Sequence, residues 1–225
     1  MRRRKSKLEK FAEISTFKNV FEFDHQLHFE ESEWKGRWQE SYFHNKNPIT
    51  VELGCGKGEY TVELARHYAN RNFIGLELKG NRIWKGARTA LYDELDNVAF
   101  IRTRADYLEN IFAPGELSEI WITFPEPHPQ EAKAKKRFTS PYFLEKYKNV
   151  LSKDGIIRLK TDCRDFFEYT LKIIHQNNYQ LLFFTHDLYN DIRPLEEEIR
   201  SVKTFYESIF LSENKPICYL EYRLI

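Results

Sequence analysis

The chain has 225 residues, of which 41% are hydrophobic and 16% aromatic, and its formal net charge is +1. This length allows one large domain or two small ones with a real hydrophobic core. A net charge so close to zero excludes a protein that attracts nucleic acid over its whole surface, so any such contact must come from local clusters of basic residues. The three cysteines are isolated and form no CxxC pair, which argues against a disulfide framework or a zinc site and favours reduced thiols.

The amino-terminal region is basic and does not have the pattern of a secretory signal. Its first residues, MRRRKSKLEKF, have no apolar stretch after the charges, and no apolar run in the chain approaches the ~18–20 residues that a membrane-spanning helix needs. We therefore expect a cytoplasmic protein without a secretory signal. The basic residues form either a solvated tail or an RNA-binding arm; they are Arg2, Arg3, Arg4, Lys5, Lys7 and Lys10.

Residues 12–47 are polar and aromatic and are interpreted as an extension of this arm. Trp34 and Trp38 are four residues apart, so they can share one face of a helix. His25 and His28 are three apart but have no third ligand nearby in the sequence, and we expect no metal site. The domain boundary is accordingly expected between residues 47 and 48.

From residue 49 the pattern alternates between strand-like and helix-like segments. Strands are expected at 49–53, 72–77, 97–102, 119–124, 155–160, 179–185 and 217–223. Helices are expected between them at 59–69, 80–94, 140–151, 164–177 and about 196–211, with Ser140 and Pro141 as the start signal of the third. The alternation predicts an α/β fold over residues 48–225, with a mostly parallel, seven-stranded, Rossmann-like sheet and helices on both faces.

A glycine-rich loop follows the first strand, in the stretch VELGCGKGEY. Gly54, Gly56 and Gly58 allow the backbone to turn sharply and a ligand to approach it closely. The loop lacks the Ser or Thr of a phosphate-binding P-loop, and its third glycine comes one residue too early for the dinucleotide pattern. With Glu52 before it, the loop has the E-x-G-x-G-x-G form that is typical of S-adenosylmethionine sites. A structural turn without a ligand is the alternative.

Two further acidic residues follow the next two strands. Glu77 ends the second strand and can accept hydrogen bonds from both ribose hydroxyls of a cofactor. Asp106 follows the third strand and can accept a hydrogen bond from an adenine amino group. Taken alone, each also fits an ordinary solvated carboxylate. Dinucleotide enzymes share an acid at the position of Glu77, so this residue supports adenosine binding without separating the cofactors. Because ligands of such sheets bind at the carboxyl ends of the strands, the acids support an adenosine cofactor at this edge, and the form of the glycine loop favours S-adenosylmethionine.

The fourth strand runs into TFPEPHPQEAKAKKRF, residues 123–138. Its prolines fix the backbone and present Glu126 on a rigid loop. Four basic residues then form the local cluster that the overall charge lacks; they are Lys133, Lys135, Lys136 and Arg137. A solvated lysine loop is the alternative interpretation of this run.

Together these segments resemble the bacterial tRNA (guanine-N7-)-methyltransferases. The family's loop F-x-D-P-W-P-K-x-R-x-x-K-R-R corresponds to FPEPHPQEAKAKKR, with the same length. Its YKGKW…NPI-x-x-E-x-G-x-G-K-G, IGIE and FKTDN segments correspond to EWKGRW…NPITVELGCGKG, IGLE and LKTDC. Its final T-x-Y-E corresponds to Thr204, Phe205, Tyr206 and Glu207. The resemblance runs in consistent order from about residue 30 to the carboxyl terminus.

The proline loop departs from the family at three positions. Glu126 stands for Asp and reaches one methylene farther, His128 stands for Trp and removes a large packing surface, and Gln130 stands for a Lys that can meet a phosphate or the base. A non-catalytic RNA-binding protein on a methyltransferase scaffold is therefore one alternative. A methyltransferase acting on another substrate is a second, and a nicotinamide oxidoreductase, which the glycine spacing disfavours, is a third. The retained glycine loop and acids favour the enzyme.

The resemblance implies an S-adenosylmethionine-dependent methyltransferase fold and methyl transfer to N7 of a guanosine in tRNA, at position 46 of the variable loop. It implies that the cofactor is bound by Glu52, Gly54, Gly56, Gly58, Glu77, Asp106 and Glu126. It implies substrate contacts for Gln130, Asp162, Thr204, Phe205, Tyr206 and Glu207. It also implies a monomer whose partner is tRNA, and together with the residues above we expect no obligate protein partner, membrane or metal.

Guanine N7 carries an in-plane lone pair and no proton, so it needs no general base and the protein's work is mostly positioning. We expect Glu126 to be the catalytic residue, because a carboxylate can stabilise the positive charge that guanine gains. RNA contacts are expected from Lys133, Lys135, Lys136 and Arg137. For Asp162 the alternative role is the N-cap of helix 164–177. For Thr204 and Glu207 it is a capping box at the start of a helix.

Overall fold

The computed structural model describes residues 5–23 and 31–224, which divide into two compact units, Met1–Ile111 and Phe112–Ile225. Arg2, Arg3 and Arg4 lie outside the described residues, as do His25 and His28. The choice between a solvated tail and an RNA-binding arm, and the expected absence of a metal site at these histidines, therefore stay predictions. Within the described ranges, no helix has the length and apolar content that crossing a bilayer requires.

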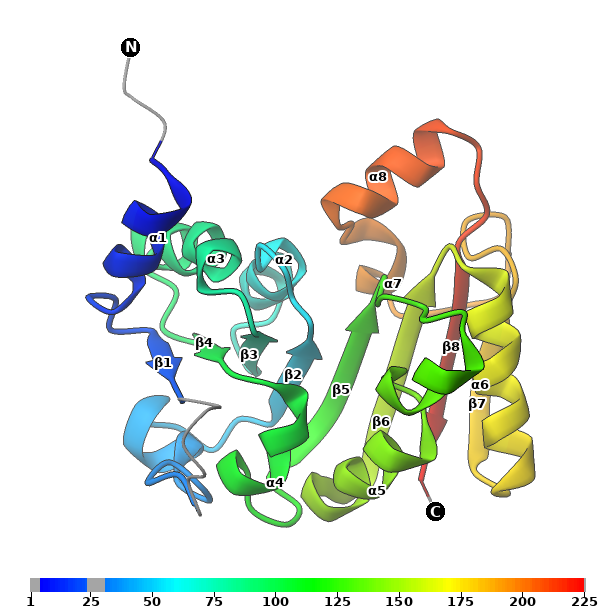
Figure 1. The fold of residues 1–225 in the computed structure, drawn as a ribbon, viewed down its shortest axis with the longest axis horizontal. Helices are drawn as coiled ribbons and strands as arrows, with labels where there is room; N and C mark the ends of the chain where they lie inside the picture. Colours follow the sequence, from blue (N-terminus) through cyan, green and yellow to red (C-terminus); the bar gives the residue numbers. More distant parts are fainter. Residues whose placement is uncertain (1–4, 24–30, 225) are drawn as a thin grey trace. The chain divides into compact units, whose positions relative to one another are not determined.

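The first unit is a parallel sheet with strands in the order β1-β4-β3-β2 (Figure 1). The strands are β1 (Val20–Glu22), β2 (Ile49–Leu53), β3 (Asn72–Glu77) and β4 (Val98–Arg102). Every residue of β2 and β3 is buried, as expected for parallel strands that are covered on both faces. The helical segments are α1 (Lys7–Ile14), η1 (Trp38–Tyr42), α2 (Glu59–His67), α3 (Gly80–Tyr92), η2 (Ala105–Tyr107) and α4 (Leu108–Ile111).

An aromatic cluster attaches β1 to this unit. Phe21 packs edge-on against the indoles of both Trp34 and Trp38, with ring centroids 4.8 and 4.9 Å away. Trp38 is fully buried and its Nε1 donates to the Ile111 carbonyl at 3.1 Å. The two tryptophans meet, with centroids 5.5 Å apart, but they do not share a regular helix, because the π-helical segment η1 begins only at Trp38.

The second unit has strands in the order β5-β6-β8-β7. These are β5 (Leu117–Thr123), β6 (Leu151–Thr161), β7 (Gln180–Thr185) and β8 (Cys218–Arg223). β5 and β6 are parallel, whereas β8 runs antiparallel to both β6 and β7. The helical segments are η3 (Glu131–Lys136), α5 (Pro141–Val150), α6 (Arg164–Gln176), α7 (Glu198–Ser201) and α8 (Phe205–Ser212). The core contains Trp121, Tyr147, Tyr219 and Tyr222.

All seven expected strands are present, and β1 adds an eighth from the segment before residue 48. The prediction of one helix at about 196–211 is wrong in one respect, because this segment forms two helices, α7 and α8. Val202 is extended and Thr204 is the extended N-cap of α8, so the chain leaves the helical conformation between them. Ser140 precedes α5 as predicted, but its hydroxyl donates to the Lys135 carbonyl at 3.0 Å instead of capping the helix.

Candidate functional site

The glycine loop of the first unit has a left-handed backbone at each of its glycines. The φ angles of Gly54, Gly56 and Gly58 are 69°, 55° and 69°, a region that residues with a Cβ rarely adopt. At Gly58, the N-cap of α2, a Cβ would stand 2.4 Å from Cε1 of Phe100. At Gly56 the nearest atom would be the Gly54 carbonyl oxygen, 4.0 Å away. Gly58 is thus needed for packing, while Gly56 leaves an open face of backbone for a ligand.

Glu52 is buried beneath this loop, with 3% of its surface exposed. Its Oε2 accepts hydrogen bonds from the backbone N–H of Thr61 at 3.0 Å and from the Thr61 hydroxyl at 2.5 Å. The carboxylate therefore ties the first turn of α2 to the end of β2 and fixes the loop between them. This anchoring role was missed by sequence reasoning, although a polar Thr in the first turn of an otherwise apolar helix face was a signal for it.

Glu77 and Asp106 lie at the same edge of the sheet as the glycine loop, because β2, β3 and β4 are parallel neighbours. Oε1 of Glu77 accepts from the Lys79 backbone N–H at 2.9 Å. Asp106 lies in η2, after β4, with its carboxylate 3.1 Å from Nε of Arg104 and 29% of its side chain exposed. The structure thus brings together the predicted cofactor residues of this unit.

The negative charge of the carboxylates at this edge affects the pKa of the buried Cys55 thiol. Burial raises the pKa of Cys55 well above its ordinary value, and the carboxylates of Glu52 and Glu77 add to the rise. Cys55 is therefore a neutral thiol at physiological pH, and its chemistry is packing rather than nucleophilic attack.

In the second unit, the proline loop after β5 contains two strained residues. Phe124 and His128 have φ angles of 47° and 44°, which are uncommon for residues with a Cβ. Strain of this kind persists only where surrounding contacts impose it and is frequent at functional sites. The loop presents Glu126 with 82% of its side chain exposed and Oε1 3.7 Å from Nδ1 of His128. A carboxylate so placed is accessible to a substrate.

Arg137 holds this loop from behind. Only 7% of its surface is exposed, and it donates to the carbonyls of His128 at 3.2 Å and Pro129 at 3.3 Å. Its guanidinium carbon lies 4.3 Å from the ring centroid of Tyr169. The predicted RNA contact of Arg137 does not fit this burial, and the side chain instead fixes the shape of the proline loop.

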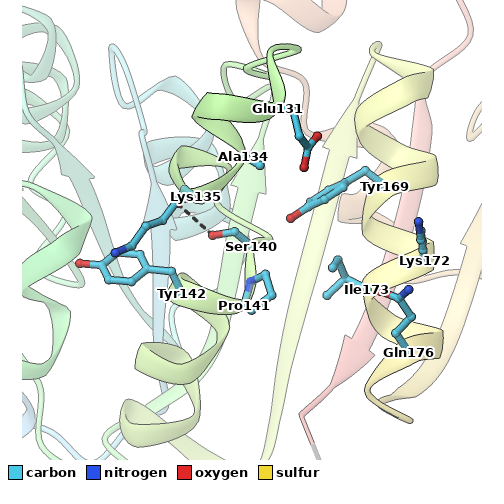
Figure 2. A pocket seen from close by; sticks show the side chains of 10 residues that line it. All are labelled: Glu131, Ala134, Lys135, Ser140, Pro141, Tyr142, Tyr169, Lys172, Ile173 and Gln176. Atoms are coloured by element: carbon cyan, nitrogen blue, oxygen red, sulfur yellow. Dashed lines mark hydrogen bonds between the residues drawn. The ribbon is translucent and has the colours of Figure 1, made fainter.

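The remaining basic residues of the loop, Lys133, Lys135 and Lys136, are exposed on η3. A cavity of about 520 Å³ lies between η3, α5 and α6 (Figure 2). On its rim, Nζ of Lys135 lies 4.4 Å from the ring centroid of Tyr142. Lys135 therefore packs on α5, whereas Gln130, just before η3, is exposed.

The other predicted substrate residues lie just after β6 and at the start of α8. Asp162 follows β6 but does not cap α6, because the N-cap is Cys163. The alternative interpretation of Thr204 and Glu207 is confirmed, since they form a capping box with bonds of 3.0 and 3.1 Å. Phe205 and Tyr206 are 52% and 60% exposed. Within the described residues, no group of His, Cys, Asp or Glu side chains is arranged to hold a metal ion.

A parallel sheet with a glycine loop and two acids at its carboxyl edge is typical of α/β proteins that bind an adenosine-containing cofactor, and comparisons with known proteins identify the methyltransferase class. A family model described as "Putative methyltransferase" matches residues 46–220. Among solved structures, that of the 16S rRNA methyltransferase KamB has a TM-score of 0.63 at 16% identity, covering 87% of this chain and 95% of that chain. These matches confirm the predicted fold class.

Comparison with curated relatives identifies the family of methyltransferases to which the chain belongs. The tRNA (guanine-N(7)-)-methyltransferase of Christiangramia forsetii is 47% identical, over 98% of each chain. That of Bacteroides thetaiotaomicron is 45% identical, over 98% of this chain and 86% of its own. The chain belongs to the tRNA (guanine-N(7)-)-methyltransferase family.

Proposed function

We propose that this protein transfers the methyl group of S-adenosylmethionine to N7 of a guanosine in tRNA, at position 46 of the variable loop. The observation that carries the proposal is the glycine loop with Glu52, Glu77 and Asp106 at one edge of the first unit's sheet, in a chain 47% identical to a protein named for this activity. The domain responsible is proposed to be residues 48–225, acting as a single chain.

The cofactor supplies an electrophilic methyl group on a sulfonium centre. The open backbone at Gly56 suits close approach of its amino-acid part. Glu77, at the end of β3, suits the ribose hydroxyls, and Asp106, in η2, suits the adenine amino group. Gly58 and Glu52 act through the loop, because both are buried in its packing.

In the transfer, the N7 lone pair forms a carbon–nitrogen bond as the carbon–sulfur bond breaks, with its electrons returning to sulfur. No proton moves, so the protein mainly aligns the reacting atoms and excludes water. The purine becomes cationic, and the exposed carboxylate of Glu126 is the group that stabilises this charge. Arg137 holds the loop that carries Glu126 and is a positioning residue.

The proposal is tested with methyl-labelled S-adenosylmethionine and tRNA that lacks modifications, followed by nucleoside analysis. Labelled 7-methylguanosine, mapped to the variable loop by chemical cleavage at the modified base, is the expected product. Small ribosomal subunits serve as the matched acceptor, because two solved structures of this fold are described as a 16S rRNA methyltransferase and a 30S ribosomal A1408 methyltransferase. Labelling of the ribosomal RNA alone, or binding of tRNA and cofactor without any product, would contradict the proposal.

A further inference from the structure

A cavity of about 600 Å³ lies in the first unit, where α1 and α3 adjoin the glycine loop. Six of its nine lining residues are basic and none is acidic; the basic ones are Lys5, Lys7, Lys10, Lys57, Arg82 and Lys85. The whole chain has a net charge of only +1. This cavity therefore concentrates positive charge far above the average of the molecule.

Neighbouring carboxylates neutralise part of this charge. Glu13 pairs with Lys5, Glu59 with Lys85 at 2.5 Å, and Glu77 with Arg82 at 3.5 Å. Lys7 and Lys10 lie one turn apart on α1, and no acidic side chain of the described residues forms an ion pair with either. The cavity thus keeps excess positive charge on the side formed by α1.

The indole of Trp84, on α3, is covered by cationic side chains and is therefore not open to a stacking nucleobase. Its Nε1 donates to Glu13 at 2.7 Å. Nζ of Lys10 lies 4.9 Å from the ring centroid and the guanidinium carbon of Arg88 lies 5.2 Å from it. Because cations already cover the indole, base stacking is not what this cavity provides.

We propose that this cavity binds the phosphate backbone of tRNA, which makes α1 part of the RNA-binding surface. The inference rests on the proposed function for the identity of the RNA. A phosphodiester matches the cavity because its charge is met by flexible ammonium groups without any requirement for base sequence. The cofactor does not match it, since a cationic sulfonium is repelled there. Lys57 lies between Gly56 and Gly58, so a phosphate in the cavity would be held next to the loop proposed for the cofactor.

The test reverses two charges on α1. Lys7→Glu/Lys10→Glu is compared with Lys18→Glu/Lys46→Glu, in which both exposed lysines precede strands β1 and β2 at the opposite, amino edge of the same sheet. The two variants have the same net charge. Binding of unmodified tRNA is measured by filter retention over a range of salt concentrations, and S-adenosylmethionine binding is measured by calorimetry.

We expect the α1 variant to bind tRNA at least about tenfold more weakly at low salt, and its salt slope to fall by about 1.5, the value for two lost phosphate contacts. The control variant should keep the wild-type affinity and slope, and both should bind the cofactor as the wild type does. If Lys7→Glu/Lys10→Glu has a lower melting temperature than the control variant, Lys7→Gln/Lys10→Gln is used instead. This variant removes the two charges without reversing them, so the free energy of tRNA binding should change by about half as much.

Equal tRNA affinity and slope in the two variants would overturn the inference, as would a loss of cofactor affinity confined to the α1 variant. The outcome is separable from that of the proposed function. Wild-type protein that binds tRNA through α1 but forms no 7-methylguanosine contradicts only the enzymatic proposal. Protein that forms 7-methylguanosine but binds tRNA equally in both variants contradicts only the phosphate site.

Discussion

Lys160 of β6 and Glu207 of α8 form an ion pair of 3.0 Å, and both side chains are completely excluded from solvent. Lys160 also donates to the Val202 carbonyl at 3.2 Å, and Glu207 accepts from the Tyr189 hydroxyl at 2.9 Å. The second oxygen of Glu207 closes the capping box with Thr204. A buried charge pair therefore fixes the start of α8, which carries the exposed Phe205 and Tyr206.

Replacing Glu207 by Gln leaves the Lys160 ammonium buried without its counter-charge. We expect the free energy of unfolding, measured with denaturant at pH 7, to fall by about 3–5 kcal/mol. The matched variant Thr204→Ala removes only the capping hydroxyl and should cost about 1 kcal/mol. Equal losses in the two variants would show that the ion pair adds nothing beyond the cap.

The deficit of Glu207→Gln should shrink as the pH rises. Burial lowers the pKa of Lys160, while the Glu207 carboxylate opposes that fall, so removing Glu207 lowers the folded-state pKa further. Lys160 in the unfolded chain titrates near ~10.4. At a pH between the folded-state and the unfolded-state pKa of Lys160, the unfolded variant binds more protons than the folded variant. The free energy of unfolding of Glu207→Gln therefore increases with pH in this range. Denaturant curves at pH 7 and pH 9.5 measure this, and a deficit that grows with pH would contradict it.

The glycine loop offers a matched pair of substitutions. Gly58→Ala combines a left-handed backbone with a Cβ 2.4 Å from Phe100, and should lower the free energy of unfolding by about 2–4 kcal/mol. Gly56→Ala has the strained backbone but open space around the methyl group, so it should cost about 1–2 kcal/mol. It should nevertheless weaken S-adenosylmethionine binding, measured by calorimetry. Equal stability losses would contradict the packing role given to Gly58.

Glu52→Ala tests whether this carboxylate acts through the loop. Loss of its bonds to Thr61 leaves a buried N–H and hydroxyl unsatisfied, and should cost about 1–3 kcal/mol of stability. Cofactor affinity should fall as well, because the loop loses its anchor. Weaker cofactor binding at unchanged stability would instead show that Glu52 contacts the ligand directly.

Arg137→Ala distinguishes a loop-positioning residue from an RNA contact. We expect methyl transfer to fall at least about tenfold, the size of effect that misplacing a reacting group produces, with the salt dependence of tRNA binding unchanged. Arg137→Lys should not restore activity, since an ammonium cannot reproduce the planar fork. Lys133→Ala/Lys136→Ala is the matched comparison and should flatten the salt dependence instead. If Arg137→Ala instead weakens the salt dependence of tRNA binding, Arg137 contacts the RNA as the sequence predicted.

Strand and helix positions could be predicted from residue 49 onward, because the buried strands and the amphipathic helices have strong periodic patterns. β1 could not, since Val20 and Phe21 are only partly buried and Glu22 is exposed, and tertiary contacts with Trp34 and Trp38 hold the strand in place. The burial of Arg137 could not be predicted from the sequence either, because an arginine at the end of a run of lysines has the pattern of a solvated basic patch. The burial of Lys160 was hidden as well, because β6 also contains Lys153, Asp154 and Arg158, and nothing in this pattern singles out Lys160 as fully buried.

The central claim is tested most directly by the rate at which 7-methylguanosine forms in unmodified tRNA, compared between the wild type and Glu126→Gln at saturating S-adenosylmethionine. We expect the wild type to form 7-methylguanosine. Glu126→Gln should bind the cofactor but lose most of the turnover, because the charge that stabilises the methylated purine is gone. Equal rates in the two proteins would remove Glu126 from the mechanism. Absence of 7-methylguanosine from the wild type would contradict the proposed activity itself.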